Sequence, residues 1–284
     1  MILRAHLADI KKTYKLFIAG AFPRSESGRS YEIKDKKGKF IANPAQASRK
    51  DLRDAVLAAK NAHSSWASAT AYNRGQILYR IAEIMEGRSE QFVSEIMAME
   101  SVTSKQAQVQ VRQAIDTWVW YAGWSDKIST IAGSTNPVAG SFFNFTVAEP
   151  LGVVGIVAEE KSSLLGVVLG LAPVLAAGNC AVLLASQKRP LSAITLAECL
   201  ATSDVPAGVV NILTGLSDEL TPHLASHMEI DGLDLSGVDS KSATALRISS
   251  VDNLKRVHSF STEKSPERIL SYMEYKTLWH PIGV

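Results

Sequence analysis

The apolar run LGVVGIVAEEKSSLLGVVLGLAPVLAAGNCAVLL, residues 151–184, constrains the fold more than any other part of the sequence. Its second part, residues 164–184, holds 21 consecutive uncharged positions, which is about the length of a membrane span. However, Pro173 lies in its middle, the pair Gly178-Asn179 lies near its end, and no belt of aromatic or basic residues flanks it. These features argue against a membrane helix and favour a run that is divided into shorter buried elements.

A βαβ unit accounts for the whole run, because parallel strands that are covered on both faces are continuously apolar. We predict two buried strands and an intervening helix, at 151–158, 180–185 and 163–177. Ser162 or Ser163 is expected to cap the start of the helix. Gly178 is expected to end the helix in the left-handed conformation that glycine adopts easily.

Five polar or charged residues, Glu159 to Ser163, separate the first strand from the helix. They form a turn at the carboxyl end of a strand, which is where open α/β sheets bind their ligands. A charged turn in this place is most often simply solvated. A role of Glu159, Glu160 and Lys161 in binding a partner is the alternative, and the sequence leaves both open.

Strands and helices alternate throughout the part of the chain that follows residue 150, as they do in doubly wound sheets. We expect helices at 191–202 and 217–226, strands at 209–213 and 230–235, and weaker elements to about residue 259. The predicted fold class is therefore α/β with a parallel central sheet.

The part that precedes residue 150 has two regions. Residues 1–128 are predicted to contain an edge hairpin and then helices, the first of which is capped by Ser48. The expected strands are 15–20 and 30–34, and the expected later helices are 71–85, 89–99 and 104–128. The aromatic residues of the last helix, Trp118, Trp120, Tyr121 and Trp124, favour packing in a core or interface over stacking on a ligand. Residues 129–149 predict an extended hairpin, so we divide the chain into 1–128, 129–149 and 150–284.

Composition excludes several classes of function. The 30 basic and 28 acidic residues are spread along the chain and leave a formal charge of +2, which argues against a nucleic-acid partner. Charges interrupt each apolar stretch of the first 20 residues, so we see no secretory signal and expect a cytoplasmic protein. Cys180 and Cys199 are too few for a disulfide framework or a multi-cysteine zinc site. We interpret both as structural and expect no metal.

Three stretches carry a resemblance to a known family: EPLGVVGIVAEEKSSLL at 149–165, LAPVLAAGNCAVLLASQ at 171–187 and VPAGVVNILTG at 205–215. They resemble the nucleotide-binding half of the aldehyde dehydrogenase superfamily. The resemblance implies a Rossmann-type doubly wound sheet with N-terminal helices and an oligomerisation-type hairpin. Family members continue into a catalytic domain with a nucleophilic cysteine, which this chain is expected to lack. The closing pattern at 278–283 is most similar to the second, truncated and non-catalytic domain of family-16 aldehyde dehydrogenases.

The chain departs from the family where the family does its chemistry. Lys161 stands in place of the asparagine that donates to the oxyanion, and Phe260 stands in place of the general-base glutamate; a phenyl ring accepts no proton. We therefore predict no catalytic residue. What remains of the cofactor site is expected to be degenerate and to consist of Val157, Ala158, Ser186, Gln187 and Gly237.

These departures predict a degenerate aldehyde-dehydrogenase-like module that is non-catalytic and serves in association or regulation, with no cofactor. One alternative is a component of an NAD- or NADP-dependent aldehyde dehydrogenase that takes its catalytic half from another chain or domain. A second is a sensor that binds NAD or NADP without using it. The resemblance implies a protein partner, or a homo- or hetero-oligomer with an aldehyde-dehydrogenase-like chain, that the hairpin at 129–149 contacts.

Overall fold

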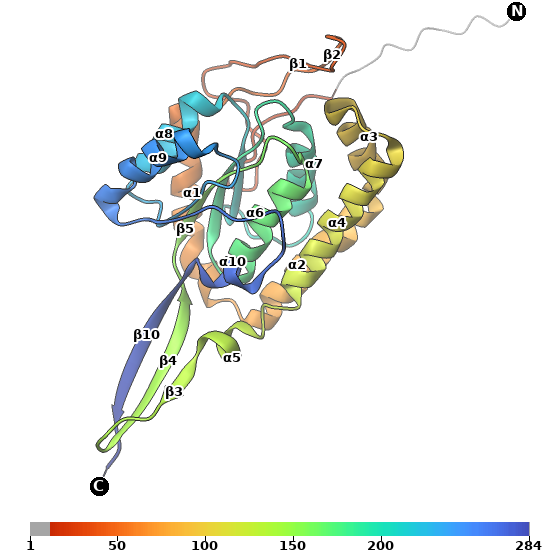
Figure 1. The fold of residues 1–284 in the computed structure, drawn as a ribbon. Coiled ribbons are helices and arrows are strands. Elements are labelled where there is room, and N and C mark those ends of the chain that lie inside the picture. Colours follow the sequence, from red (N-terminus) through yellow and green to blue (C-terminus); the bar gives the residue numbers. More distant parts are fainter. Residues whose placement is uncertain (1–11, 284) are drawn as a thin grey trace, which may run out of the picture.

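A five-stranded parallel sheet lies at the centre of the computed structural model, which describes residues 12–283 (Figure 1). The strands follow the order β7-β6-β5-β8-β9. Their bounds are Val153–Val157 for β5, Cys180–Leu184 for β6, Val210–Leu213 for β7, Gly232–Asp234 for β8 and Arg256–His258 for β9. The predicted α/β class and the predicted strands after residue 150 are confirmed. The chain order reverses between β5 and β8, which makes this pair the topological switch point of the sheet.

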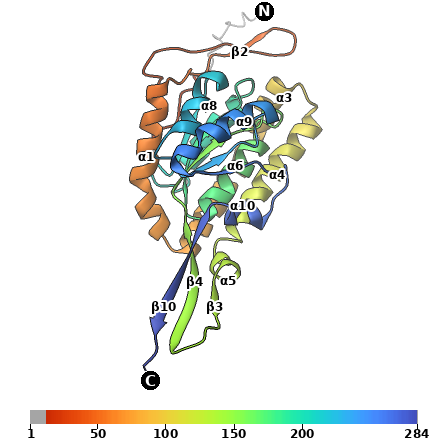
Figure 2. The ribbon, with the colours of Figure 1, turned by 60° about the vertical axis from the view of Figure 1, so that its left-hand side comes forward.

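Helices cover both faces of the sheet. On one face α1 (Arg49–Ser68) packs on β6 and β7, and α8 (Ser217–Ser226) packs on β5. On the other face α6 (Leu165–Ala176) packs on β5 and β6, and α7 (Leu191–Leu200) packs on β7. The helix α9 (Ser240–Ser249) lies beside α8 (Figure 2). The apolar residues of these layers join one core with those of the N-terminal helices.

The start of α6 differs from the sequence-based expectation. Neither Ser162 nor Ser163 caps the helix, whose N-cap residue is Leu164. The N–H groups just before the helix reach side chains of other helices: Ser163 N donates to Glu100 Oε1 at 2.9 Å, and Leu164 N donates to Gln110 Oε1 at 3.2 Å. Long-range acceptors therefore bind the residues that lead into the helix, and the helix start itself has no side-chain cap.

The end of α6 follows the prediction. Gly178 has φ +91°, the left-handed conformation, directly after the helix. The helix has 12 residues. Within residues 12–283, none of the helices is long and apolar enough to cross a membrane.

Three helices of the N-terminal region pack behind α6 and α7. Their bounds are Ala71–Gly87 for α2, Ser89–Glu100 for α3 and Ser104–Ala122 for α4. The predicted helix 104–128 is too long, because α4 ends at Ala122 and a short α5 (Ile128–Ala132) follows. Trp118 and Tyr121 are fully buried, and Trp120 and Trp124 pack against the core, which confirms the packing interpretation. Ser48 caps α1 as expected, in a capping box with Asp51.

The predicted hairpin between 15–20 and 30–34 is wrong. Phe17 pairs with Ile212 instead, with N–H···O distances of 2.9 and 2.8 Å between the two backbones. The short β1 (Ile33–Lys34) pairs with β2 (Phe40–Ala42). The physical reason is that β7 is the edge strand of the central sheet, and residue 17 satisfies backbone groups there that a local hairpin would leave open.

An arm of three antiparallel strands projects from the body (Figure 2). It consists of β3 (Ser134–Asn136), β4 (Phe142–Pro150) and β10 (Met273–Pro281), with β4 in the middle. The predicted hairpin supplies β3 and β4. The sequence analysis missed β10, which pairs with β4 in unbroken register from Met273–Pro150 to Pro281–Phe142. It follows α9 through a 3-10 turn (Val251–Asn253), β9 and α10 (Pro266–Leu270).

Candidate functional site

The switch point between β5 and β8 is closed by backbone contact. Gly237, in the turn after β8, donates its N–H to the carbonyl oxygen of Val157 at the end of β5, at 3.1 Å. A Cβ atom on Gly237 would lie 2.2 Å from the carbonyl oxygen of Ala158, so only glycine fits this approach. The predicted residues Val157, Ala158 and Gly237 are therefore brought together, but they contact each other rather than line an open crevice.

Little space remains beside this contact. The cavity that Asp234, Glu159 and Arg268 line together with residues of β5 and α6 has a volume of about 10 Å³. A cavity of this size holds about one water molecule. Pockets that bind small ligands and cofactors have volumes of roughly 300–1,000 Å³. The cavity at the switch point is thus too small for a cofactor.

Two buried ionisable side chains make hydrogen bonds beside this contact. Burial raises the pKa of the Asp234 carboxyl, which accepts the Ser236 N–H at 2.9 Å. Arg268, of which 3% is exposed, donates to the carbonyl oxygen of Leu169 in α6 at 2.9 Å and to that of Ser261. These bonds fasten the segment that follows β9 to α6.

Phe260 occupies an aromatic cluster. Its ring stacks on His258 with 5.5 Å between centroids and meets Tyr272 edge-on at 6.0 Å, while Arg268 lies over it at 4.7 Å. Its backbone N–H donates to Ser236 Oγ at 2.9 Å. The position at which the resemblance implies a general base thus holds a packed ring that ties two turns together.

Glu160 is the residue whose role the sequence analysis missed. Its carboxylate accepts hydrogen bonds from Ser186 Oγ and Gln187 N, both at 2.8 Å, and from Lys188 N at 3.3 Å. The expectation that this turn is simply solvated is wrong for Glu160, whereas the Lys161 side chain is exposed. Because Glu160 follows β5 and Ser186 follows β6, the ends of two adjacent parallel strands place the donors and the acceptor side by side. That adjacency was the available signal.

Gln187 reaches the start of α8. Its Oε1 atom accepts the backbone N–H of Ser217, the first residue of the helix, at 3.0 Å. The free N–H groups at such a helix start are the usual partners of a phosphate in dinucleotide-binding folds. Ser186 and Gln187, two of the predicted cofactor residues, are therefore bound to the protein's own acceptors and donors. The residues present do not fit a dinucleotide without rearrangement of these contacts.

Neither cysteine has the environment of a nucleophile. Cys180 in β6 and Cys199 in α7 are fully buried, and burial raises the pKa of each thiol to about 12.

The described part of the chain contains no group of three or more His, Cys, Asp or Glu side chains that could hold a metal ion. The sequence analysis overlooked that His223 and His227 are four residues apart: His223 lies in the last turn of α8, and His227 directly follows the helix.

The strand order and the switch point define the fold class of the protein, which is a doubly wound sheet of the dinucleotide-binding type. The sequence profile of the aldehyde dehydrogenase family matches residues 22–273. The chain belongs to the aldehyde dehydrogenase family.

Individual relatives agree with this assignment. The chain is 33% identical to cytosolic 10-formyltetrahydrofolate dehydrogenase of Xenopus tropicalis, over 90% of this chain and 29% of that protein. It is 34% identical to retinal dehydrogenase 2 of Gallus gallus, over 93% of this chain and 51% of that protein. The chain thus spans between about a third and a half of the length of these curated relatives.

Solved structures show the same partial coverage. The NAD+ complex of an aldehyde dehydrogenase from Bacillus cereus superposes with a TM-score of 0.82 at 26% identity, over 87% of this chain and 50% of that one. HpcC from Thermus thermophilus gives a TM-score of 0.83 at 28% identity, over 87% of this chain and 48% of that one. The fold of the family is therefore retained along most of the chain.

Proposed function

We propose that this chain is a non-catalytic aldehyde-dehydrogenase-like module that serves in association with another protein. The observation that carries the proposal is the set of contacts made by Glu160, whose carboxylate takes the donors of Ser186 and Gln187. A carboxylate in this position also repels the phosphates of a dinucleotide. The family fold is then kept for its shape and stability rather than for a bound cofactor.

The chemical groups of the site support a non-catalytic role. Phe260 accepts no proton, and the exposed Lys161 ammonium is no fixed amide donor for an oxyanion. Both cysteines are buried with raised pKa values, so neither thiolate forms readily near neutral pH. We expect no NAD- or NADP-dependent oxidation of aldehydes by this stretch of chain.

Calorimetric titration with NAD and NADP tests the proposal directly. Family relatives have been solved with NAD+, so the B. cereus enzyme is a suitable positive control. We expect that titration of this chain with either cofactor gives no saturable binding heat up to millimolar concentrations. Micromolar binding of NAD or NADP would contradict the proposal. It would mean that the cofactor displaces the contacts of Glu160 with Ser186 and Gln187, and it would favour a sensor or a split enzyme.

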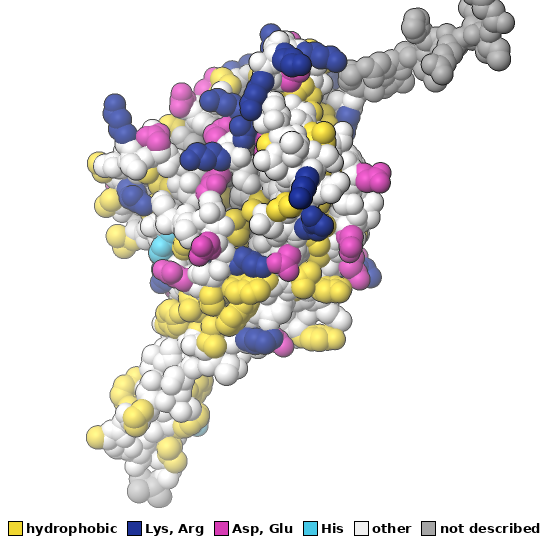
Figure 3. All heavy atoms as spheres, turned by 45° about the vertical axis from the view of Figure 1, so that its right-hand side comes forward, with side chains coloured by type: hydrophobic (Ala, Val, Ile, Leu, Met, Phe, Trp, Pro, Cys, Tyr) yellow, Lys and Arg dark blue, Asp and Glu magenta, His cyan; other side chains and the backbone are white. Residues whose placement is uncertain are grey.

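The arm is the surface that we propose for association. Among the described residues the nine-residue strand β10 pairs with β4 on one side only, so its other edge has no strand partner, although Arg256 donates to the carbonyl oxygen of Met273. One face of the arm carries Phe143, 48% exposed, and Leu278, 44% exposed, which lies opposite Phe145 in the register. Figure 3 shows hydrophobic side chains on the arm and a band of them where the arm meets the body. Exposed apolar surface of this kind is typical of interfaces.

Sedimentation of an arm variant tests this role. The partner we propose is an aldehyde-dehydrogenase-like chain, either a second copy of this one or a homologue that supplies a catalytic half. Leu278→Lys should weaken self-association or co-sedimentation with such a homologue, whereas Leu57→Lys, at an exposed site on α1, should not. Equal sedimentation masses for the wild type and Leu278→Lys would argue against the arm as the association surface. Aldehyde oxidation that exceeds the homologue's own rate after mixing would favour the split-enzyme alternative.

A further inference from the structure

A groove between the start of α1 and the end of α8 carries a group of cationic side chains that the proposed function does not use. Its volume is 660 Å³. Its lining includes three basic residues of α1, two histidines at the end of α8 and one carboxylate, namely Arg49, Lys50, Arg53, His223, His227 and Glu26. It shares no residue with the switch point, so it is a separate site.

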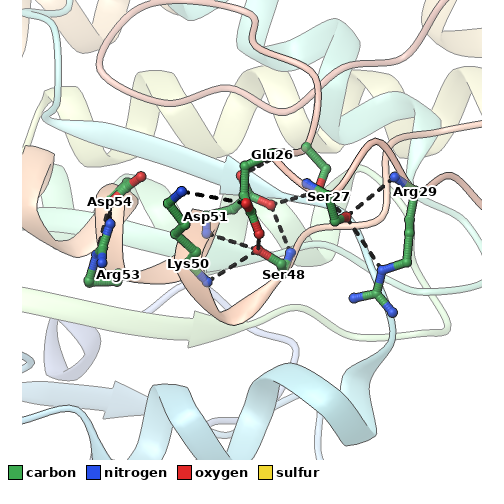
Figure 4. A network of polar contacts seen from close by, with 9 residues as sticks. Glu26, Ser27, Arg29, Ser48, Lys50, Asp51, Arg53 and Asp54 are labelled. Carbon is green, nitrogen blue, oxygen red and sulfur yellow. Dashed lines mark hydrogen bonds and ion pairs between the residues drawn. The ribbon is translucent and has the colours of Figure 1, made fainter.

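The wall of the groove is held by a hydrogen-bond network (Figure 4). Asp51 accepts the Ser25 hydroxyl at 2.7 Å and the Ser48 N–H at 2.8 Å, and Ser48 Oγ lies 2.9 Å from Glu26 Oε1. Ser48 also caps the first N–H groups of α1. A ligand in the groove would therefore be held by side chains and not by the helix terminus.

The basic side chains are only partly neutralised. Lys50 Nζ lies 3.5 Å from Glu26 Oε2, and Arg53 pairs with its neighbour Asp54 at 2.7 Å. None of the ion pairs found among residues 12–283 involves Arg49. Residues 49 and 53 are one helical turn apart, so their guanidinium groups share one side of α1.

His227 adds a neutral donor on the opposite wall. Its Nδ1 accepts the backbone N–H of Glu229 at 3.2 Å, so the proton of the neutral ring lies on Nε2. Burial lowers the pKa of His227, and the nearby Lys255 lowers it further, so both favour the neutral ring. His223 lies four residues earlier, at the end of the same helix.

We propose that this groove binds the phosphate group of a small organic phosphate. Guanidinium groups match phosphate oxygens in paired hydrogen bonds, and an imidazole N–H adds a further donor. The volume falls in the range of small-molecule pockets, which is more than a free ion needs. Leu52 and Met228 give the lining an apolar part that suits an organic substituent.

Calorimetry with phenyl phosphate and inorganic phosphate, at constant ionic strength, tests the proposal on the whole chain. Phenyl phosphate should bind more tightly than inorganic phosphate, and its affinity should fall about tenfold or more in Arg49→Gln/Arg53→Gln because two charged donors are lost. Arg80→Gln is the matched control, since Arg80 lies on α2 and its side chain is 54% exposed. Arg49 and Arg53 are exposed, so the double variant should fold normally, as circular dichroism will check.

A second readout locates the ligand. Phenyl phosphate should shift the Nε2–H resonance of His227 in the wild type and not in the double variant. Equal affinities of wild type and double variant, or no binding by the wild type, would overturn the proposal. NAD binding that disappears in Arg49→Gln/Arg53→Gln would belong to this groove. NAD binding that persists in the double variant would count against the proposed non-catalytic module and would leave the phosphate proposal untouched.

Discussion

Replacing Glu160 with alanine tests the contacts that close the cofactor site. The change removes an acceptor that serves Ser186 Oγ and two backbone N–H groups, at 2.8, 2.8 and 3.3 Å. Hydrogen bonds to a charged group contribute roughly 1.5–3 kcal/mol each. Water can replace the carboxylate at Gln187 and at the exposed Lys188, but the Ser186 side chain is buried and loses its acceptor outright. We therefore expect Glu160→Ala to lower the free energy of unfolding by about 2 kcal/mol, less than the sum of three bonds.

Urea unfolding followed by circular dichroism measures this loss. Lys161→Ala is the control, and an exposed side chain of this kind should change the stability by less than about 0.5 kcal/mol. Ser186→Ala completes a double-mutant cycle, in which a coupling of about 1 kcal/mol is expected between the two side chains. Unfolding of Glu160→Ala at the wild-type urea concentration, or zero coupling to Ser186, would refute the reasoning.

Three further predictions concern the close approach at Gly237 and the two buried thiols. Gly237→Ala should cost about 3 kcal/mol or more in the same unfolding assay, because its Cβ would lie 2.2 Å from the Ala158 oxygen, whereas Gly87→Ala meets no atom within 4 Å and should be nearly neutral. Cys180 and Cys199 should resist a thiol reagent at pH 8 until the chain unfolds, since burial raises their pKa to about 12. Unfolded thiols ionise near their ordinary pKa of 9.0 while the folded ones stay protonated, so their contribution to stability is intact below pH 9 and declines as the pH rises toward 12. When the pH is raised from 8 to 10, the free energy of unfolding should therefore fall less in a variant with both cysteines replaced by alanine than in the wild type.

Local pattern predicted the central sheet well. The apolar runs at 151–158 and 180–185 became β5 and β6, because strands covered on both faces must be continuously apolar. Gly178 ended α6 as expected, since its left-handed conformation is a local requirement. The predicted serine cap is wrong: α6 begins at Leu165 without a side-chain cap, and the preceding N–H groups of Ser163 and Leu164 bind Glu100 and Gln110, which are distant in the sequence.

Long-range partners explain the other failures. The segment MEYKTLWHP alternates apolar and charged residues only over its first four positions, and its pairing with the distant β4 makes it a strand. The pairing of Phe17 with Ile212 is equally remote in the sequence. The role of Glu160 required two strand ends to be placed side by side. The resemblance located the departures at Lys161 and Phe260, but not what the substituted residues contact.

The register between β4 and β10 has a consequence for the order of folding. The two strands are separated in sequence by the whole of the central sheet, from β5 to β9. Closing so long a loop is entropically costly until the intervening residues have collapsed. We expect the arm to gain protection in pulsed hydrogen exchange after β5 and β6, and earlier protection of the arm would contradict this. A partner that recognises the paired arm would therefore engage only molecules whose central sheet is already complete.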